Sequence, residues 1–236
     1  MIYFDNGSTS FPKAPGVGAA MASLLEHAGF NINRGGYEGA YAVADMVLDT
    51  REMLCKLFDW QDPKSVCFTG NVTQSLNLIL KGFLKPGDHV VVSSMEHNAV
   101  MRPLNQLAAQ GVTFDAAQAN PDGILPVERV EALLRPETRL VVMTHASNIC
   151  GTILPIMEVG ALCKAKGIPF VVDAAQTAGI LPLSMKALHT AAIAFTDHKG
   201  LLGPQGIGGM VIREEFAQQM EPLISGGTGS VSDTEY

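Results

Sequence analysis

FVVDAAQ (residues 170–176) and AIAFTDHKG (residues 192–200) are two short apolar runs, each of which ends in polar side chains. A short apolar run bounded by polar residues is typical of a strand buried on both faces, and the polar residues then mark its carboxyl end. Similar runs recur along the chain, and helical patterns separate them. This alternation predicts an α/β fold with a mostly parallel, seven-stranded sheet flanked by helices.

The pattern also predicts where the elements lie. We expect strands at residues 66–69, 89–93, 112–116, 140–144, 170–173, 192–196 and 209–212, and helices between them at 72–84, 97–110, 126–134 and 155–167. Ahead of the sheet we expect a short strand at 2–4 and helices at 13–28 and 37–58, and after it a helix at 214–220. We divide the chain into an N-terminal segment (residues 1–40) and a large domain (residues 41–236).

Composition and charge argue against several classes of protein. The formal net charge is -7 and Lys and Arg form no cluster, so we expect no nucleic-acid binding. The longest stretch without Asp, Glu, Lys or Arg, residues 140–157, is interrupted by polar residues, and the N-terminus does not read as a signal peptide, so we expect no membrane association. The four cysteines form no C-x-x-C pair, which favours reduced thiols and a cytoplasmic location. We expect Cys150 to pack as a small apolar side chain.

Residues suited to chemistry follow several predicted strands. Because ligands gather at the carboxyl ends of parallel strands, these side chains are expected to converge on one edge of the sheet. They include a turn with backbone N–H groups at the start of a helix, an imidazole, a carboxylate, two side-chain amides and a lysine. The candidates are Val72, Thr73, His97, Asn148, Asp173, Gln176, Thr196 and Lys199.

This set matches what pyridoxal 5'-phosphate (PLP) requires. A lysine must hold the aldehyde as an imine, and a carboxylate must keep the pyridine nitrogen protonated so that the ring acts as an electron sink. Lys199 and Asp173 suit these two roles, and His97 is placed to stack on the ring. No metal site is expected.

The remaining candidates suit the phosphate and the ring oxygen. The N–H groups at the helix start near Val72 and Thr73, with the Thr196 hydroxyl, can donate to a phosphate. Asn148 and Gln176 can donate to the phenolate oxygen of the ring. Each residue alone has a simpler explanation, such as a solvated loop lysine or a carboxylate that caps a helix, and only the combination favours the cofactor.

The glycine-rich run GPQGIGG (203–209) does not indicate a dinucleotide site. It leads into a predicted strand, and it lacks the strand–G-x-G-x-x-G–helix order that such sites need.

Six segments carry a resemblance to a known family. They are YFDNGSTSFP (3–12), FTGNVTQSLNLI (68–79), SSMEHNAV (93–100), THASNICGTI (144–153), VVDAAQ (171–176) and FTDHKGLLGPQGIGG (195–209). In this order they resemble the class V aminotransferase family, and within it the branch of cysteine desulfurases and selenocysteine lyases. The resemblance spans essentially the whole chain.

The resemblance implies the large domain of a PLP-dependent transferase that removes sulfur or selenium from a small amino-acid substrate. It implies that Lys199 is the Schiff-base lysine and that His198 joins Val72, Thr73 and Thr196 at the phosphate. It also implies a homodimer in which Thr228 reaches the partner's phosphate, a substrate contact by Arg34, and a sulfur-acceptor protein that serves the full-length form.

The chain departs from the family pattern at several points. It has DNGSTS at 5–10 where desulfurases usually have DNAATT, Glu96-His97-Asn98 where many have E-H-H, and Asn71-Val72-Thr73 where the phosphate loop usually has Gly-Thr-Thr. Relatives continue into a small C-terminal domain that holds the carboxylate-binding arginine and the sulfur-accepting cysteine. We therefore expect that domain to be absent and the truncated chain to be poorly active. Two alternatives stay open. One is another class V aminotransferase, an epimerase or a lyase, and the other is a truncated non-catalytic PLP-binding module.

Overall fold

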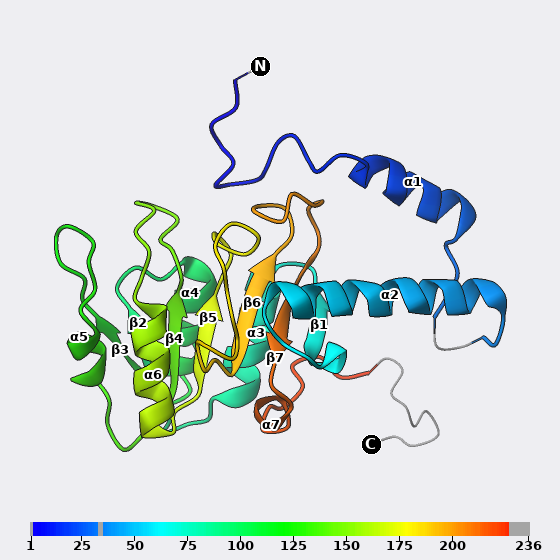
Figure 1. Cartoon of the computed structure of the whole chain (residues 1–236). Helices are drawn as coiled ribbons and strands as arrows, with labels where there is room; N and C mark the ends of the chain where they lie inside the picture. The colour runs from blue at the N-terminus through cyan, green and yellow to red at the C-terminus, as the bar shows by residue number, and fades with distance from the viewer. Residues whose placement is uncertain (1, 33–34, 227–236) are drawn as a thin grey trace.

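The structure is a computed structural model that describes residues 2–32 and 35–226, and it confirms the predicted α/β fold (Figure 1). Seven strands form one sheet in the order β1-β7-β6-β5-β4-β2-β3. Only β7 runs antiparallel to its neighbours, β1 and β6, and all other pairs are parallel. The strands are β1 (Val66–Thr69), β2 (His89–Ser93), β3 (Thr113–Ala117), β4 (Thr138–Thr144), β5 (Phe170–Asp173), β6 (Ala192–Thr196) and β7 (Gly208–Ile212).

The helices also lie close to the predicted positions. They are α1 (Val17–His27), α2 (Glu38–Leu57), α3 (Val72–Phe83), α4 (Asn98–Ala108), α5 (Val127–Glu131), α6 (Ile156–Lys166) and α7 (Glu214–Ala217), with a 3-10 turn η1 (Pro63–Ser65) before β1. The helices are shorter than the patterns predicted, and β3 lies one residue later.

Two predictions near the N-terminus were wrong. Residues 2–4 form no strand, because they have no neighbouring strand to pair with, and Phe4 is 95% exposed. The first helix begins at Val17 rather than at residue 13. The Ala14 N–H donates to the Leu202 carbonyl, and Gly16 takes a left-handed φ of 88° directly before the helix.

Side chains of the central strands alternate between two apolar cores. In β6, Ile193 and Phe195 lie in the core that α5 and α6 cover. Ala192 and Ala194 face the other core, which α3, α4 and α7 cover. The alternation follows from the twofold repeat of a strand, and burial of both faces explains why the runs contain almost no polar residues.

Helices α1 and α2 differ from the others because they bury little of their surface. α1 has no buried residue, and in α2 only Ala40 and Cys55 are buried. In Figure 1, α2 extends from the sheet toward the side where α1 lies. Large apolar side chains therefore remain exposed on both helices, among them Met21, Leu25, Tyr41, Met46, Leu48 and Met53. No helix in the described part of the chain is long and apolar enough to span a membrane.

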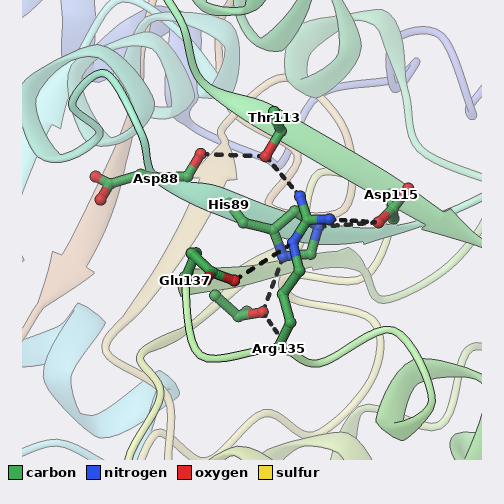
Figure 2. A network of polar contacts seen from close by, with 7 residues as sticks. Asp88, His89, Thr113, Asp115, Arg135 and Glu137 are labelled. Carbon is green, nitrogen blue, oxygen red and sulfur yellow. Dashed lines mark hydrogen bonds and ion pairs between the residues drawn. The ribbon is translucent and has the colours of Figure 1, made fainter.

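A polar network closes the amino-terminal edge of the sheet (Figure 2). His89 at the start of β2 is fully buried, its Nδ1 lies 2.8 Å from Thr138 Oγ1, and its Nε2 lies 3.2 Å from Asp115 Oδ2. The carboxylate can only accept, so Nε2 carries the proton and Thr138 donates to Nδ1 in the neutral ring. Arg135 completes the network by donating to Thr113 Oγ1 at 2.7 Å.

We predict that His89 makes folding stability depend on pH. Burial, with a smaller effect of Arg135, lowers the pKa of His89 against the opposing effect of Asp115. The unfolded chain therefore gains a proton near pH 6.5 that the folded chain does not accept. Stability is complete above that pH and falls as the pH drops toward the folded pKa, by at most about 1.4 kcal/mol per pH unit.

Thermal unfolding between pH 7.5 and pH 5 should therefore show a shallower decline for His89→Gln than for the unsubstituted chain. His27→Gln, at an exposed position of α1, is the control and should retain the full slope. Equal slopes for the chain and the His89 variant would contradict the prediction.

Candidate functional site

Asp173 is a buried carboxyl group at the carboxyl edge of the sheet. It ends β5, its side chain is 1% exposed, and its Oδ1 accepts the Ala175 N–H at 2.9 Å. Burial raises the pKa of Asp173, while the Ala175 N–H and the charges of His97 and Lys199 oppose that rise. The structure thus brings Asp173, His97 and Lys199 close enough for their charges to interact, as the sequence predicted.

Lys199 follows β6 and lines a cavity of about 650 Å³. Burial lowers the pKa of its amine, and Asp173 opposes this effect. Gln176 lines the same cavity, together with residues of the N-terminal segment, of the turns after β5 and of the loop after Lys199; these are Asn6, Gly7, Ser10, Phe11, Pro12, Lys13, Ala14, Pro15, Ile180, Gly200 and Leu202. A lysine with a lowered pKa in a partly enclosed cavity is suited to nucleophilic or imine chemistry.

The N-terminal segment is fastened to the lysine loop at one backbone oxygen. The His198 carbonyl, one residue before Lys199, accepts the Ser10 N–H at 2.7 Å. The Ser10 and Thr9 hydroxyls lie at 3.0 and 3.1 Å from the same oxygen, and Lys13 Nζ lies at 3.3 Å. These contacts hold residues 9–13 over the loop and form one wall of the cavity.

Two buried polar atoms near the end of β6 have no hydrogen-bond partner within the described residues. They are Thr196 Oγ1, in a residue that is 1% exposed, and His198 Nδ1. Burial of a polar atom without a partner is costly, so such atoms suggest that a ligand completes the site. Burial, and to a smaller extent Lys199 and Lys13, lowers the pKa of His198, which favours the neutral ring.

The start of α3 lies against the same strand end. Gly208 of β7 pairs with Thr69 of β1 on one side and with Thr196 of β6 on the other. A Cβ on Gly208 would lie 2.8 Å from Asn71 Cα, so only glycine allows this close approach. The Asn71 side chain caps α3 by accepting the Gln74 N–H at 3.0 Å. The first N–H groups of the helix, at Val72 and Thr73, have no acceptor one turn earlier and remain suited to an anion.

His97 caps α4 and is exposed. Its Nδ1 accepts the Ala99 N–H at 3.0 Å, which leaves the ring face open to stacking. His97 and Thr73 line a second cavity of about 260 Å³ between α3 and α4. The predicted cofactor residues therefore line two different cavities, and the Lys199 cavity contains neither Thr73 nor His97.

The remaining predictions have mixed outcomes. Gln176 Nε2 donates to the Gly7 carbonyl at 3.1 Å, so the N-terminal segment already uses part of its amide. Asn148 is exposed in the loop after β4, and no polar contact of its side chain is recorded among the described residues. Arg34 and Thr228 lie outside the described residues.

The prediction for Cys150 was wrong. Its side chain is exposed, its Sγ lies 3.3 Å from Thr152 Oγ1, and hydrogen bonds with Ser147 and Thr152 lower the pKa of the thiol to about 7. The loop turns the side chain outward, which the local apolar pattern did not reveal.

These residues fit PLP as a group. The orphaned hydroxyl of Thr196, the orphaned nitrogen of His198 and the free N–H groups of α3 supply donors for a phosphate. Asp173 supplies a buried carboxylate and Lys199 a partly buried amine. Sequence reasoning missed Ser10 and Lys13, because their role depends on the His198 carbonyl, almost 190 residues away in the chain.

Three comparisons with known proteins agree with this geometry. A family model described as Aminotransferase class-V matches residues 2–235. Cysteine desulfurase IscS of Shewanella sediminis is 35% identical over 234 residues, and the match covers 96% of this chain and 57% of that protein. The chain thus spans a little over half the length of the curated relatives that it matches.

Solved structures of related proteins have a similar fold. The apo structure of cysteine desulfurase from Thermococcus onnurineus NA1 has a TM-score of 0.89 and 33% identity, over 96% of this chain and 57% of that one. A structure of SspA in complex with cysteine has a TM-score of 0.88 and 27% identity, over 96% of this chain and 65% of that one.

We predict opposite effects of Thr196→Val on stability and on ligand binding. Valine keeps the shape of threonine and removes an unpartnered hydroxyl, so the cofactor-free protein should become more stable by about 1 kcal/mol. The variant should also bind PLP more weakly, because one phosphate donor is lost. Thermal unfolding and a PLP titration measure the two effects, and Thr152→Val, at a half-buried loop position, is the control. Unchanged PLP affinity in Thr196→Val would remove Thr196 from the site.

Proposed function

The chain belongs to the class V aminotransferase family, and on this premise we propose that it forms the cofactor-binding part of a PLP-dependent enzyme that removes sulfur or selenium from an amino acid. Cysteine is the proposed substrate, since relatives are cysteine desulfurases and the SspA structure holds cysteine. The single observation that carries the proposal is the buried carboxyl group of Asp173 in the neighbourhood of Lys199 and His97.

Each residue of the proposed site has a role that follows from its chemistry. Asp173 would favour a protonated pyridine nitrogen, since a buried carboxylate stabilises a nearby positive charge strongly. When bound, PLP supplies an electron sink for negative charge that develops at the substrate's α-carbon. The Lys199 amine would hold the aldehyde carbon and, once a substrate amine has displaced it, could accept and return a proton.

The other proposed contacts orient the cofactor. Thr196, His198, Val72 and Thr73 would hold the phosphate, and His97 would stack on the ring. Gln176 and Asn148 would donate to the ring oxygen. Thr228 and Arg34 stay proposals from the family resemblance alone, for the partner's phosphate and for the substrate.

A homodimer is supported by the exposed apolar side chains of α1 and α2. A 20-residue helix with two buried residues contributes little to the core of a single chain. A second copy would cover this surface in a symmetric assembly. We also propose that the full-length form has a sulfur-acceptor protein as its partner. The chain is proposed to divide into a segment of residues 1–40 and a domain of residues 41–236. We further propose a cytoplasmic location, because the four cysteines are free thiols.

We predict that Lys199 carries the cofactor. Borohydride treatment of the PLP-loaded protein should fix a reduced pyridoxyl group on one lysine, and peptide mapping should find it on Lys199. Lys13 also lines the cavity and provides the sharpest control, because a label there would show that the cavity holds PLP in another orientation. Lys199→Ala should abolish the label, whereas Lys164→Ala, at the far end of α6, should leave it unchanged.

We also predict that the 236-residue chain turns over cysteine slowly. The cations among the residues that line the Lys199 cavity are Lys13 and Lys199, and no described arginine lines it. A carboxylate clamp normally relies on the two parallel donors of an arginine, and poor positioning costs about a hundredfold in rate.

Sulfide release from cysteine, compared with a full-length relative at saturating PLP, measures this effect. Comparable rates would show that the clamp lies within residues 1–236. Keto-acid formation without sulfide would favour an aminotransferase over a desulfurase.

A further inference from the structure

Glu96 lies in the loop between β2 and α4, one residue before His97, and none of the roles above involves it. Its Oε1 accepts the Ser93 hydroxyl at 2.5 Å. The Thr144 N–H donates to both carboxyl oxygens, at 2.9 Å and 3.0 Å. The carboxyl group therefore connects the end of β2 with the end of β4, inside the carboxyl edge that holds the proposed cofactor site.

The backbone geometry explains why this acceptor is needed. β2 and β4 pair as far as Val92↔Val142, after which Ser94 turns toward β3 and donates to the Ala117 carbonyl. On the other side of β4, the His145 N–H donates to the Asp173 carbonyl. Successive N–H groups of a strand point in opposite directions, so the Thr144 N–H faces the side that β2 has left. The Glu96 carboxyl group takes the place of the missing strand there.

The Glu96 carboxyl group lies close enough to Asp173 for the two groups to interact. Burial raises the pKa of Glu96 to about 8, against the opposing hydrogen bonds of Ser93 and Thr144, and the negative charge of Asp173 raises it further. Burial raises the pKa of Asp173, and His97 and Lys199 oppose that rise, whereas the charged neighbour recorded for Glu96 among the described residues is Asp173. With a pKa of about 8, Glu96 is uncharged near neutral pH and connects the two strand ends as a neutral carboxyl group.

Residues on both sides of this connection belong to the proposed site. His97 follows Glu96 directly and caps α4, while Thr144 is the register partner of Asp173 in the β4–β5 pair. We propose that Glu96 is a positioning residue: by joining Ser93 to the Thr144 N–H, it sets where the His97 ring lies relative to Asp173. This inference deepens the proposed function, because His97 and Asp173 matter as a pair only if PLP lies between them.

Amide hydrogen exchange in the cofactor-free protein tests the connection itself. Glu96→Ala removes the acceptor, so the Thr144 and Ala99 amides should exchange about tenfold faster. Glu96→Gln retains an acceptor oxygen for Thr144 and should keep both rates within about twofold of the original. Glu158→Ala, at an exposed position of α6, is the matched control and should change neither rate. Unchanged Thr144 exchange in Glu96→Ala would overturn the proposal.

A titration provides a signature that a purely structural side chain would not show. The amide proton shift of Thr144 should titrate near pH 8 in the unsubstituted protein, as the carboxyl group that it donates to becomes charged. The same step should be missing in Glu96→Gln. A step that persists in Glu96→Gln would assign the titration to another group and contradict the raised pKa of Glu96.

PLP binding then separates this inference from the proposed function. Affinity should fall about tenfold in Glu96→Ala and recover in Glu96→Gln, since only the latter retains the geometry of His97. If the unsubstituted protein bound no PLP, the proposed function would fail, whereas the exchange and titration results would still decide whether Glu96 connects the strands.

A second variant tests the proposal if Glu96→Ala does not fold. Ser93→Ala removes the hydroxyl that donates to Glu96, and it should raise the exchange rate of the Ala99 amide at least about threefold. An unchanged rate would contradict the proposal.

Discussion

The carboxyl group of Asp173, buried at the end of β5, is the constraint on which the carboxyl edge of the sheet depends. A buried charge is tolerated only where hydrogen bonds and opposite charges compensate for the lost water. The compensation comes from the Ala175 N–H of the same chain segment, from Lys199 after β6 and from His97 at the start of α4. Three separate parts of the chain are thereby required to meet at one point. A fourth part, the end of β4, is connected to them because its Thr144 N–H donates to Glu96.

The N-terminal segment is the second component that shapes the site. Its described residues are largely exposed and none of them joins the sheet, yet donors from Thr9, Ser10 and Lys13 converge on the His198 carbonyl. Contacts to a backbone oxygen hold the lysine loop without using the side chain of Lys199, which lines the cavity. The segment therefore contributes a wall of the cavity without contributing to the apolar core.

Buried polar atoms without a partner lie at both ends of β6 in the described residues: Thr190 Oγ1 comes before the strand, and Thr196 Oγ1 and His198 Nδ1 lie at its carboxyl end. At the amino edge, His89, Thr138 and Asp115 form a closed network in which the described donors and acceptors are matched. At the carboxyl edge, Thr196 Oγ1 and His198 Nδ1 are buried without a partner in the described residues. Unsatisfied polar atoms reduce stability, and the two at the carboxyl end of β6 lie where the ligand site is proposed.

The sequence by itself determined the seven strands, the order of strands and helices along the chain and the polar residues that follow each strand. Apolar periodicity reports burial directly, and the carboxyl ends of parallel strands share one edge whatever the details of packing. From this, the proximity of Asp173, His97 and Lys199 could be predicted. Only the tertiary structure decided that residues 2–4 form no strand, that Cys150 faces solvent, that Lys13 reaches the His198 carbonyl and that Glu96 replaces a strand beside Thr144. Those outcomes depend on which distant backbone groups lack a partner, and local sequence patterns carry no information about that.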